Sequence, residues 1–119
     1  MQHRIIRIKP AEAMSLVESG KAVMLDVVAP VSRAHMRRQI AGAVRIEPEE
    51  FSARYQEFLP RDKQIIAYCT CEDEITSADV AQDLRRHGYQ AFALKGGYAA
   101  WEEVGYPTEP KKRPAAKAQ

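Results

Sequence analysis

Cys69 stands where a fold could make a cysteine reactive. It ends an apolar run over residues 64–69 that is typical of a strand, and a short polar segment separates it from a helical pattern starting at Thr76. Backbone N–H groups and the N-terminal end of the helix dipole would then converge on the sulfur and favour the thiolate, which is a nucleophile. The alternative is a small buried apolar side chain, because free cysteines are often buried.

The segment after Cys69 supplies the other candidate loop and substrate-binding residues. They are Thr70, Cys71, Glu72, Asp73, Glu74, Ile75 and Thr76. Three carboxylates near a thiolate oppose its ionisation, and they repel an anionic substrate. The alternative is a solvated helix entrance, where acidic residues are favoured by the helix dipole in any case.

Cys71 lies two residues after Cys69. It could resolve a persulfide or a sulfenic acid on Cys69, which would make the two cysteines a redox pair. The two sulfurs could also bind a soft metal, but two ligands do not complete a tetrahedral site, so we expect no metal. The spacing is not typical of a structural disulfide framework.

A second set of polar candidates follows another predicted strand. Asp26 lies near the end of the apolar run 22–28, and we expect it to anchor that strand end by accepting hydrogen bonds from loop N–H groups. Arg33, Arg37 and Arg38 come next along the chain. They form either a solvated basic face or a source of one guanidinium at the mouth of the site. We take Asp26 and Arg33 as supporting residues.

The elements that must position these residues alternate along the chain. Strands are predicted at residues 5–8, 22–28, 43–46, 64–69 and 90–94. Helices are predicted at 10–19, 48–59, 76–87 and 98–104, with a capping box at Thr76-x-x-Asp79. Residues 29–42 fit no pattern. The alternation predicts an α/β fold whose mostly parallel sheet is covered by helices on both faces.

Length and composition are those of a single globular domain. The 119 residues are 45% hydrophobic and 29% charged. No apolar run approaches the roughly 18 residues that cross a bilayer, and charges interrupt the first residues too often for a signal peptide. We therefore expect a cytoplasmic protein without membrane insertion.

The charge is unevenly distributed. Residues 1–110 contain 14 basic and 16 acidic residues and so carry a net charge of −2, whereas Lys111, Lys112, Arg113 and Lys117 add +4, which gives the overall +2. The last residues also lack an apolar period, so we expect 108–119 to be a flexible basic tail. Because the body is slightly acidic, we expect no nucleic acid to bind.

Five short motifs occur in order along the chain. They are Pro10–Gly20, Val23–Val27 with its Asp-Val pair, Ile40–Ile46 with Gly42-Ala43, Ile65–Cys69, and Leu94–Trp101 with Gly96-Gly97. Each is weak alone, but together they resemble the rhodanese-like (sulfurtransferase) family over roughly residues 5–107.

The resemblance implies a three-layer α/β/α fold with a central five-stranded parallel sheet, formed by residues 1–107. It implies that Cys69 accepts a sulfane sulfur as a persulfide and passes it on. The implied partners are a small sulfur donor, thiosulfate or a persulfide, and a thiol acceptor that could be a protein. We expect no cofactor.

The loop departs from the family pattern. Common members have Cys-x-x-Gly-x-Arg, whose arginine binds anionic donors, and Glu74 takes the place of that arginine. Related phosphatases need Cys-x5-Arg, where this chain has Ile75, so phosphate chemistry is not expected. The loop instead resembles a less common variant, Cys-x-Cys-x-x-Glu-x-Thr-Ser. Further departures are Val28 for arginine, Gln39 for histidine and Ala41 for proline.

These departures bear on substrate and function. Thiosulfate is expected to be a poor donor beside a neutral or protein-borne persulfide. Two alternatives to the enzyme stay open: a rhodanese-like module of weak activity that binds a partner protein, and a Cys69–Cys71 redox pair.

Overall fold

The computed structural model describes residues 6–47, 55, 57–70 and 75–113. Cys71, Glu72, Asp73 and Glu74 lie outside the described residues, as does most of the helix predicted at 48–59, of which Tyr55, Glu57 and Phe58 are helical. Within the described ranges, no helix is long and apolar enough to cross a membrane.

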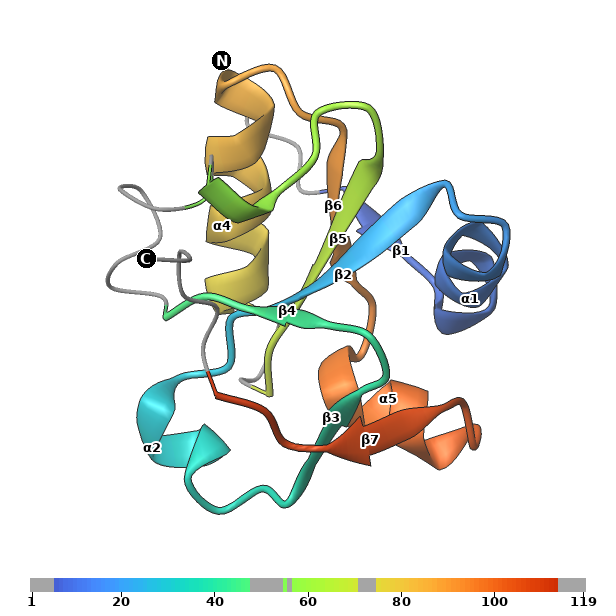
Figure 1. Ribbon diagram of the computed structural model, residues 1–119, viewed down its shortest axis with the longest axis vertical. Helices are drawn as coiled ribbons and strands as arrows, with labels where there is room; N and C mark the ends of the chain where they lie inside the picture. The colour runs from blue at the N-terminus through green and yellow to red at the C-terminus, as the bar shows by residue number, and fades with distance from the viewer. Residues whose placement is uncertain (1–5, 48–54, 56, 71–74, 114–119) are drawn as a thin grey trace.

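Five parallel strands form the central sheet, as predicted (Figure 1). In spatial order they are β1 (Arg7–Ile8), β6 (Ala91–Leu94), β5 (Gln64–Tyr68), β2 (Ala22–Asp26) and β4 (Val44–Arg45). The register pairs Asp26 with Tyr68 on one side and with Arg45 on the other. The C-terminal ends of β2, β4 and β5 therefore meet at one edge of the sheet, and Cys69 follows β5 at that edge.

Helices cover both faces of the sheet, which confirms the three-layer α/β/α prediction. Among the described residues these helices are α1 (Pro10–Glu18), α4 (Ile75–Arg86) and α5 (Gly97–Glu103), while the short α2 (Pro30–Arg33) lies beyond the C-terminal end of β2 (Figure 1). Alternate residues of each strand point to opposite faces. One face packs Leu25, Val27, Ile65 and Ala67 against Val80, Ala81 and Leu84 of α4; the other packs Met24, Val28 and Ile66 against Ala13 of α1 and Trp101 of α5.

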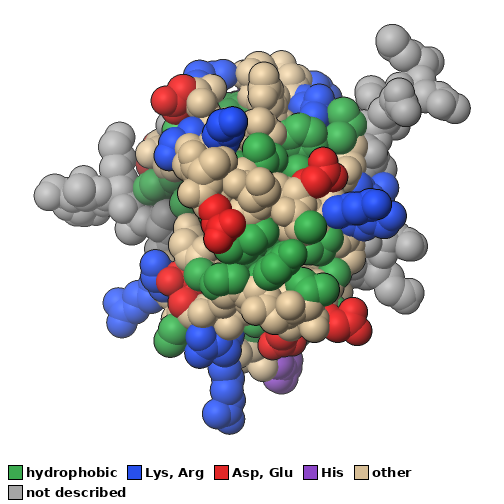
Figure 2. Space-filling view, turned by 90° about the vertical axis from the view of Figure 1, so that its right-hand side faces the viewer, with side chains coloured by type: hydrophobic (Ala, Val, Ile, Leu, Met, Phe, Trp, Pro, Cys, Tyr) green, Lys and Arg blue, Asp and Glu red, His purple; other side chains and the backbone are tan. Residues whose placement is uncertain are grey.

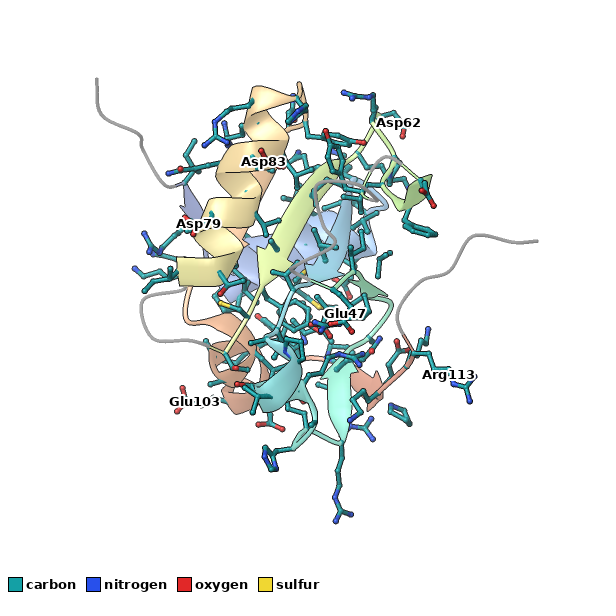
Figure 3. The ribbon with its side chains drawn as sticks, turned by 90° about the vertical axis from the view of Figure 1, so that its left-hand side faces the viewer. Glu47, Asp62, Asp79, Asp83, Glu103 and Arg113 are labelled. Atoms are coloured by element: carbon teal, nitrogen blue, oxygen red, sulfur yellow. The ribbon has the colours of Figure 1, made fainter. Side chains whose placement is uncertain are left out.

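The sides of the helices that face away from the sheet carry polar and charged side chains. Asp79 and Asp83 lie on the side of α4 away from the sheet, opposite its apolar stripe (Figure 3). On the α1 side of the molecule, hydrophobic side chains are interspersed with charged ones (Figure 2).

A small second sheet was not predicted. β3 (Arg38–Ile40), in the unassigned stretch 29–42, pairs antiparallel with β7 (Thr108–Pro110). The prediction of a flexible tail over 108–119 is therefore wrong for residues 108–113; residues 114–119 lie outside the described ranges. The pairing escaped the sequence patterns because polar contacts between residues about 70 positions apart hold it, and such contacts leave no local period.

Several such contacts hold the two segments of this ribbon, residues 37–40 and 108–112, together, and one holds the residue before it. The Arg38 guanidinium donates to Thr108 Oγ1 at 2.7 Å and to the Thr108 carbonyl at 2.8 Å. Lys111 N donates to the Arg37 carbonyl, and Trp101 Nε1 donates to the Pro107 carbonyl at 2.9 Å. Lys111 and Lys112 thus lie beside Arg37 and Arg38. The division into an acidic body and a separate basic tail therefore does not describe the fold. The expectation that no nucleic acid binds, which was based on that division, loses its basis.

Element boundaries near the site also differ from the predictions. β5 ends at Tyr68, so Cys69 is the first residue beyond it. α4 begins at Ile75, which puts Thr76 inside the helix rather than at the capping position before it.

We predict that the ribbon contributes to stability. A chain ending at Pro107 loses β7 and leaves the buried Arg33 and Gln39 without partners from residues 109–112. Each buried polar group left unpaired costs about 1–3 kcal/mol. We therefore expect its free energy of unfolding in urea to be lower by about 2 kcal/mol or more than that of a chain ending at Arg113. Equal values for the two chains would show that the ribbon contributes nothing.

Candidate active site

The Cys69 side chain lies between the end of β5 and the start of α4. It is 1% exposed, and its Sγ lies 3.5 Å from Ser77 Oγ in the first turn of α4. Cys69 continues the face of Ile65 and Ala67, because strand side chains alternate. The thiol donates its hydrogen bond to the Ser77 hydroxyl, and the N-terminal end of a 12-residue helix lies next to the sulfur, where the helix dipole favours a thiolate.

The described neighbours of Cys69 in the chain differ in exposure. Thr70 is exposed, Ile75 is 60% exposed, and Thr76 is half-buried. Ile75 and Thr76 are the first two residues of α4, the helix that carries Ser77. The predicted site residues Cys71, Glu72, Asp73 and Glu74 are outside the described part of the chain.

The backbone of Cys69 is held by the start of α5. Tyr98 N donates a hydrogen bond to the Cys69 carbonyl at 3.1 Å. Gly97 has a positive φ of 60°, and a Cβ at this position would collide with the same carbonyl oxygen. Gly97, the second residue of the Gly96-Gly97 motif, thus lets two segments of backbone approach each other at the candidate nucleophile.

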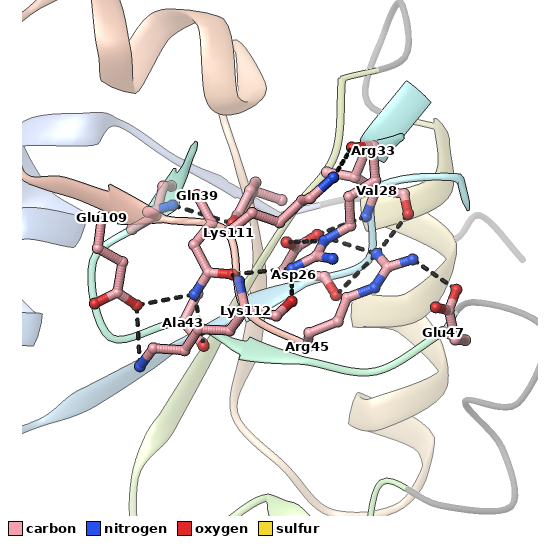
Figure 4. A network of polar contacts seen from close by, with 12 residues as sticks. Asp26, Val28, Arg33, Gln39, Ala43, Arg45, Glu47, Glu109, Lys111 and Lys112 are labelled. Carbon is pink, nitrogen blue, oxygen red and sulfur yellow. Dashed lines mark hydrogen bonds and ion pairs between the residues drawn. The ribbon is translucent and has the colours of Figure 1, made fainter. Parts of the chain in front are cut away.

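Asp26 lies at the same sheet edge and is 1% exposed (Figure 4). Its Oδ1 accepts a hydrogen bond from Val28 N at 3.0 Å, the kind of loop contact expected of it. It also forms two ion pairs that were not expected: Arg33 Nε lies 2.9 Å from Oδ2, and Arg45 Nη1 lies 3.1 Å from Oδ1. Asp26 therefore joins the ends of β2 and β4 to α2.

Arg33 belongs neither to a solvated basic face nor, by its described contacts, to the mouth of the site; its ion pair with Asp26 suits a supporting residue. It is 8% exposed, so it is not part of a solvated basic face. Its Nη2 donates to Gln39 Oε1 at 2.9 Å and to the Lys112 carbonyl at 2.7 Å, and its Nε is paired with Asp26. Its described contacts hold the ribbon to α2 rather than aiming at Cys69.

Arg45 was missed at the sequence level. It is 2% exposed, and besides Asp26 it contacts the Val28 carbonyl and pairs with Glu47 Oε1 at 2.7 Å. The pairing of β4 with β2 places Arg45 beside Asp26. A short strand with one arginine does not reveal that pairing by itself.

The Tyr68 hydroxyl is a further buried polar group at this edge of the sheet. It accepts a hydrogen bond from Ile40 N at 3.2 Å. Burial raises the pKa of Tyr68 above its ordinary value, and the negative charge of Asp26 raises it further. Tyr68 therefore stays protonated at neutral pH and contributes position rather than acid–base chemistry.

Among the described residues, no three His, Cys, Asp or Glu side chains lie close enough together to bind one metal ion. The groups that can act chemically in the described part of the site are the Cys69 thiol and its hydroxyl neighbour. The paired charges around Asp26 position the strand ends on which they lie.

Comparison with known proteins agrees with this geometry. The family model for the rhodanese-like domain matches residues 9–104, most of the chain. The chain belongs to the rhodanese-like domain family. The resemblance inferred from the five motifs is thereby confirmed.

Individual relatives of this rhodanese-like domain are distant. It is 30% identical over 82 residues to "tRNA sulfurtransferase" of Desulfurococcus amylolyticus, covering 69% of this chain and 15% of that protein. It is 26% identical over 110 residues to "Thiosulfate sulfurtransferase GlpE" of Glaesserella parasuis, covering 92% and 97%. A rhodanese-related protein from Thermoplasma volcanium matches in structure with a TM-score of 0.71 at 25% identity, covering 87% and 97%.

The contact between Gly97 and Cys69 generates a prediction with a matched control. Gly105 also has a positive φ, 79°, but nothing lies within 4 Å of a Cβ built there. Gly105→Ala should cost only the backbone strain, about 1–2 kcal/mol. Gly97→Ala adds a collision with the Cys69 carbonyl, so we expect it to lower the free energy of unfolding by at least about 1 kcal/mol more.

Gly97→Ala should also change the rate at which iodoacetamide alkylates Cys69, whereas Gly105→Ala should leave it unchanged. Equal effects of the two variants on both measurements would mean that the close approach of Gly97 does not position the nucleophile.

Proposed function

We propose that this rhodanese-like domain is a sulfurtransferase whose Cys69 carries a sulfane sulfur as a persulfide. The observation that carries the proposal is the place of the Cys69 thiol at the end of β5, 3.5 Å from Ser77 Oγ in the first turn of α4. A thiol at the N-terminal end of a helix is favoured as thiolate, and the thiolate is the form that attacks sulfur. The relatives named as thiosulfate sulfurtransferase and tRNA sulfurtransferase support the same reaction class.

The reaction consists of two displacements at sulfur. The Cys69 thiolate attacks the outer sulfur of the donor, a new S–S bond forms, and the donor's own bond to that sulfur breaks. Thiosulfate then leaves as sulfite, and a persulfide donor leaves as a thiolate. In the second step an acceptor thiolate attacks the outer sulfur of the Cys69 persulfide and Cys69 leaves as thiolate.

The remaining predicted site residues have different roles in this proposal. Thr70, Ile75 and Thr76 flank the sulfur in sequence, and the acidic residues Glu72, Asp73 and Glu74 disfavour an anionic donor by charge alone. We therefore propose a neutral or protein-borne persulfide as the better donor. Asp26 and Arg33 support the site through the strand ends that they hold and do not react.

Mass spectrometry of the intact protein tests the proposal. After exposure to a persulfide donor and removal of excess reagent, the protein should gain one sulfur atom, located on Cys69 by peptide mapping, and a thiol should remove it. Cys69→Ser should gain none, and Cys71→Ser, the matched control, should gain it as the unchanged protein does.

The same experiment separates the alternatives. A sulfur adduct that is absent with every donor, in a protein shown to be folded, would contradict the proposal and favour a partner-binding module. Loss of the adduct in both variants would show that the two cysteines act as a unit, as a redox pair does.

A further inference from the structure

A pocket of about 160 Å³ lies where α2, the end of β4 and the residue after β7 come together. We call it the Arg45 pocket. Its volume admits a ligand of about six non-hydrogen atoms, since an engineered protein cavity of about 150 Å³ binds benzene. A molecule of this size fits inside, whereas a nucleotide or a peptide does not. The residues that line it are Pro30, Arg33, Ala34, Arg45, Glu47 and Lys111.

The charged groups of the Arg45 pocket leave an excess of positive charge. Arg33 and Arg45 share the carboxylate of Asp26, and Arg45 also pairs with Glu47 at 2.7 Å. Two carboxylates thus balance the two guanidinium groups. The remaining charge belongs to Lys111, whose ammonium group has no carboxylate partner in the part of the chain that the structure describes. A ligand with one negative charge would balance it.

Arg45 contributes a buried N–H group without a partner. The residue is 2% exposed, its Nη1 donates to Asp26 and its Nη2 donates to Glu47, but its Nε has no hydrogen-bond partner among the described residues. In the planar guanidinium group, Nε–H lies on the same edge as Nη2, so this donor is on the side of Glu47, which lines the pocket. A buried donor without a partner is costly, and an oxygen atom of a ligand would satisfy it.

Arg33 and Lys111 add donors from two other elements. Within the described ranges, the Arg33 guanidinium makes its contacts through Nε and Nη2, so both N–H groups of Nη1 remain for a ligand. Lys111 Nζ donates to the Arg33 carbonyl at 3.1 Å, which holds the ammonium group at the pocket with two further N–H groups (Figure 4). Donors from β4, α2 and the segment after β7 therefore meet at one small pocket.

We propose that the Arg45 pocket binds the carboxylate of a small organic acid. One oxygen of the ligand accepts a hydrogen bond from Arg45 Nε, and the other accepts from Arg33 Nη1 and Lys111 Nζ. Charge-assisted hydrogen bonds of this kind are stronger than those between neutral groups. The bound anion balances the excess charge and links α2, β4 and the segment after β7.

The Arg45 pocket is separate from the candidate nucleophile. Leu25 and Val27, the residues on either side of Asp26, point to the α4 face of the sheet, and so does the Cys69 sulfur. Asp26 and its partner Arg45 therefore point to the other face, because side chains alternate along a strand. The ligand takes no part in the reaction of Cys69, and the proposal does not depend on sulfur transfer.

An NMR titration with acetate tests the proposal. At an ionic strength held constant with chloride, acetate should shift the Arg45 Nε–H signal and the Lys111 amide signal, and both shifts should reach saturation. Acetamide has nearly the same shape as acetate but no charge, so it should shift neither signal.

Three variants show whether the binding occurs in the Arg45 pocket. Lys111→Gln should weaken acetate binding roughly fivefold or more, because it removes a charged donor. Lys112→Gln is the matched control: it removes the same charge one residue further on, where Nζ pairs with Glu109 outside the pocket. It should change the affinity by less than about twofold, since salt screens the lost charge. Ala34→Leu keeps every charged group but takes up space in the pocket, so it should weaken binding by roughly tenfold or more.

The outcomes decide the proposal in either direction. The replaced side chains are exposed, and the amide spectrum of each variant shows whether it is folded. Absence of saturable shifts with acetate, equal shifts with acetamide, or equal binding by all three variants would overturn the proposal. Because no step of the titration involves Cys69, its result stands whether or not the protein transfers sulfur.

Discussion

One buried carboxylate between two buried guanidinium groups organises the C-terminal edge of this sheet. Asp26, 1% exposed, pairs with Arg33 at 2.9 Å and with Arg45 at 3.1 Å. A buried arginine is strongly unfavourable without an acidic partner, so the carboxylate permits both arginines to be buried at once. Through them it links β2 to α2 and β4, and through the contact of Arg33 with Lys112 it reaches the C-terminal ribbon.

The candidate site depends on this edge being held in place. Tyr68 is the register partner of Asp26, and Cys69 follows Tyr68 at once. Positioning is thus done by paired, buried charges, whereas the group proposed to react is the Cys69 thiol.

The sheet and its covering helices were predictable because their signals are local. Continuous apolar runs gave β2, β5 and β6, and proline or glycine marked the helix ends, as at Pro10 and Gly88. Cys69 was found by its place after such a run. The ribbon of β3 and β7 and the burial of Arg33 were not predictable, because they rest on contacts such as that of Arg38 with Thr108, far apart in sequence and without a period. A charged residue in a short irregular stretch shows no sign of its distant partner.

The central claim, that the Asp26 carboxylate holds the edge of the sheet together, is tested most directly by the free energy of unfolding of Asp26→Asn. The substitution keeps the size of the side chain but leaves two buried guanidinium groups without their shared charge, so stability in urea should fall by about 3–5 kcal/mol. Asp83→Asn is the matched control, because its partner Arg86 is 59% exposed, and it should cost less than about 1 kcal/mol. A loss for Asp26→Asn no larger than that of the control would contradict the account.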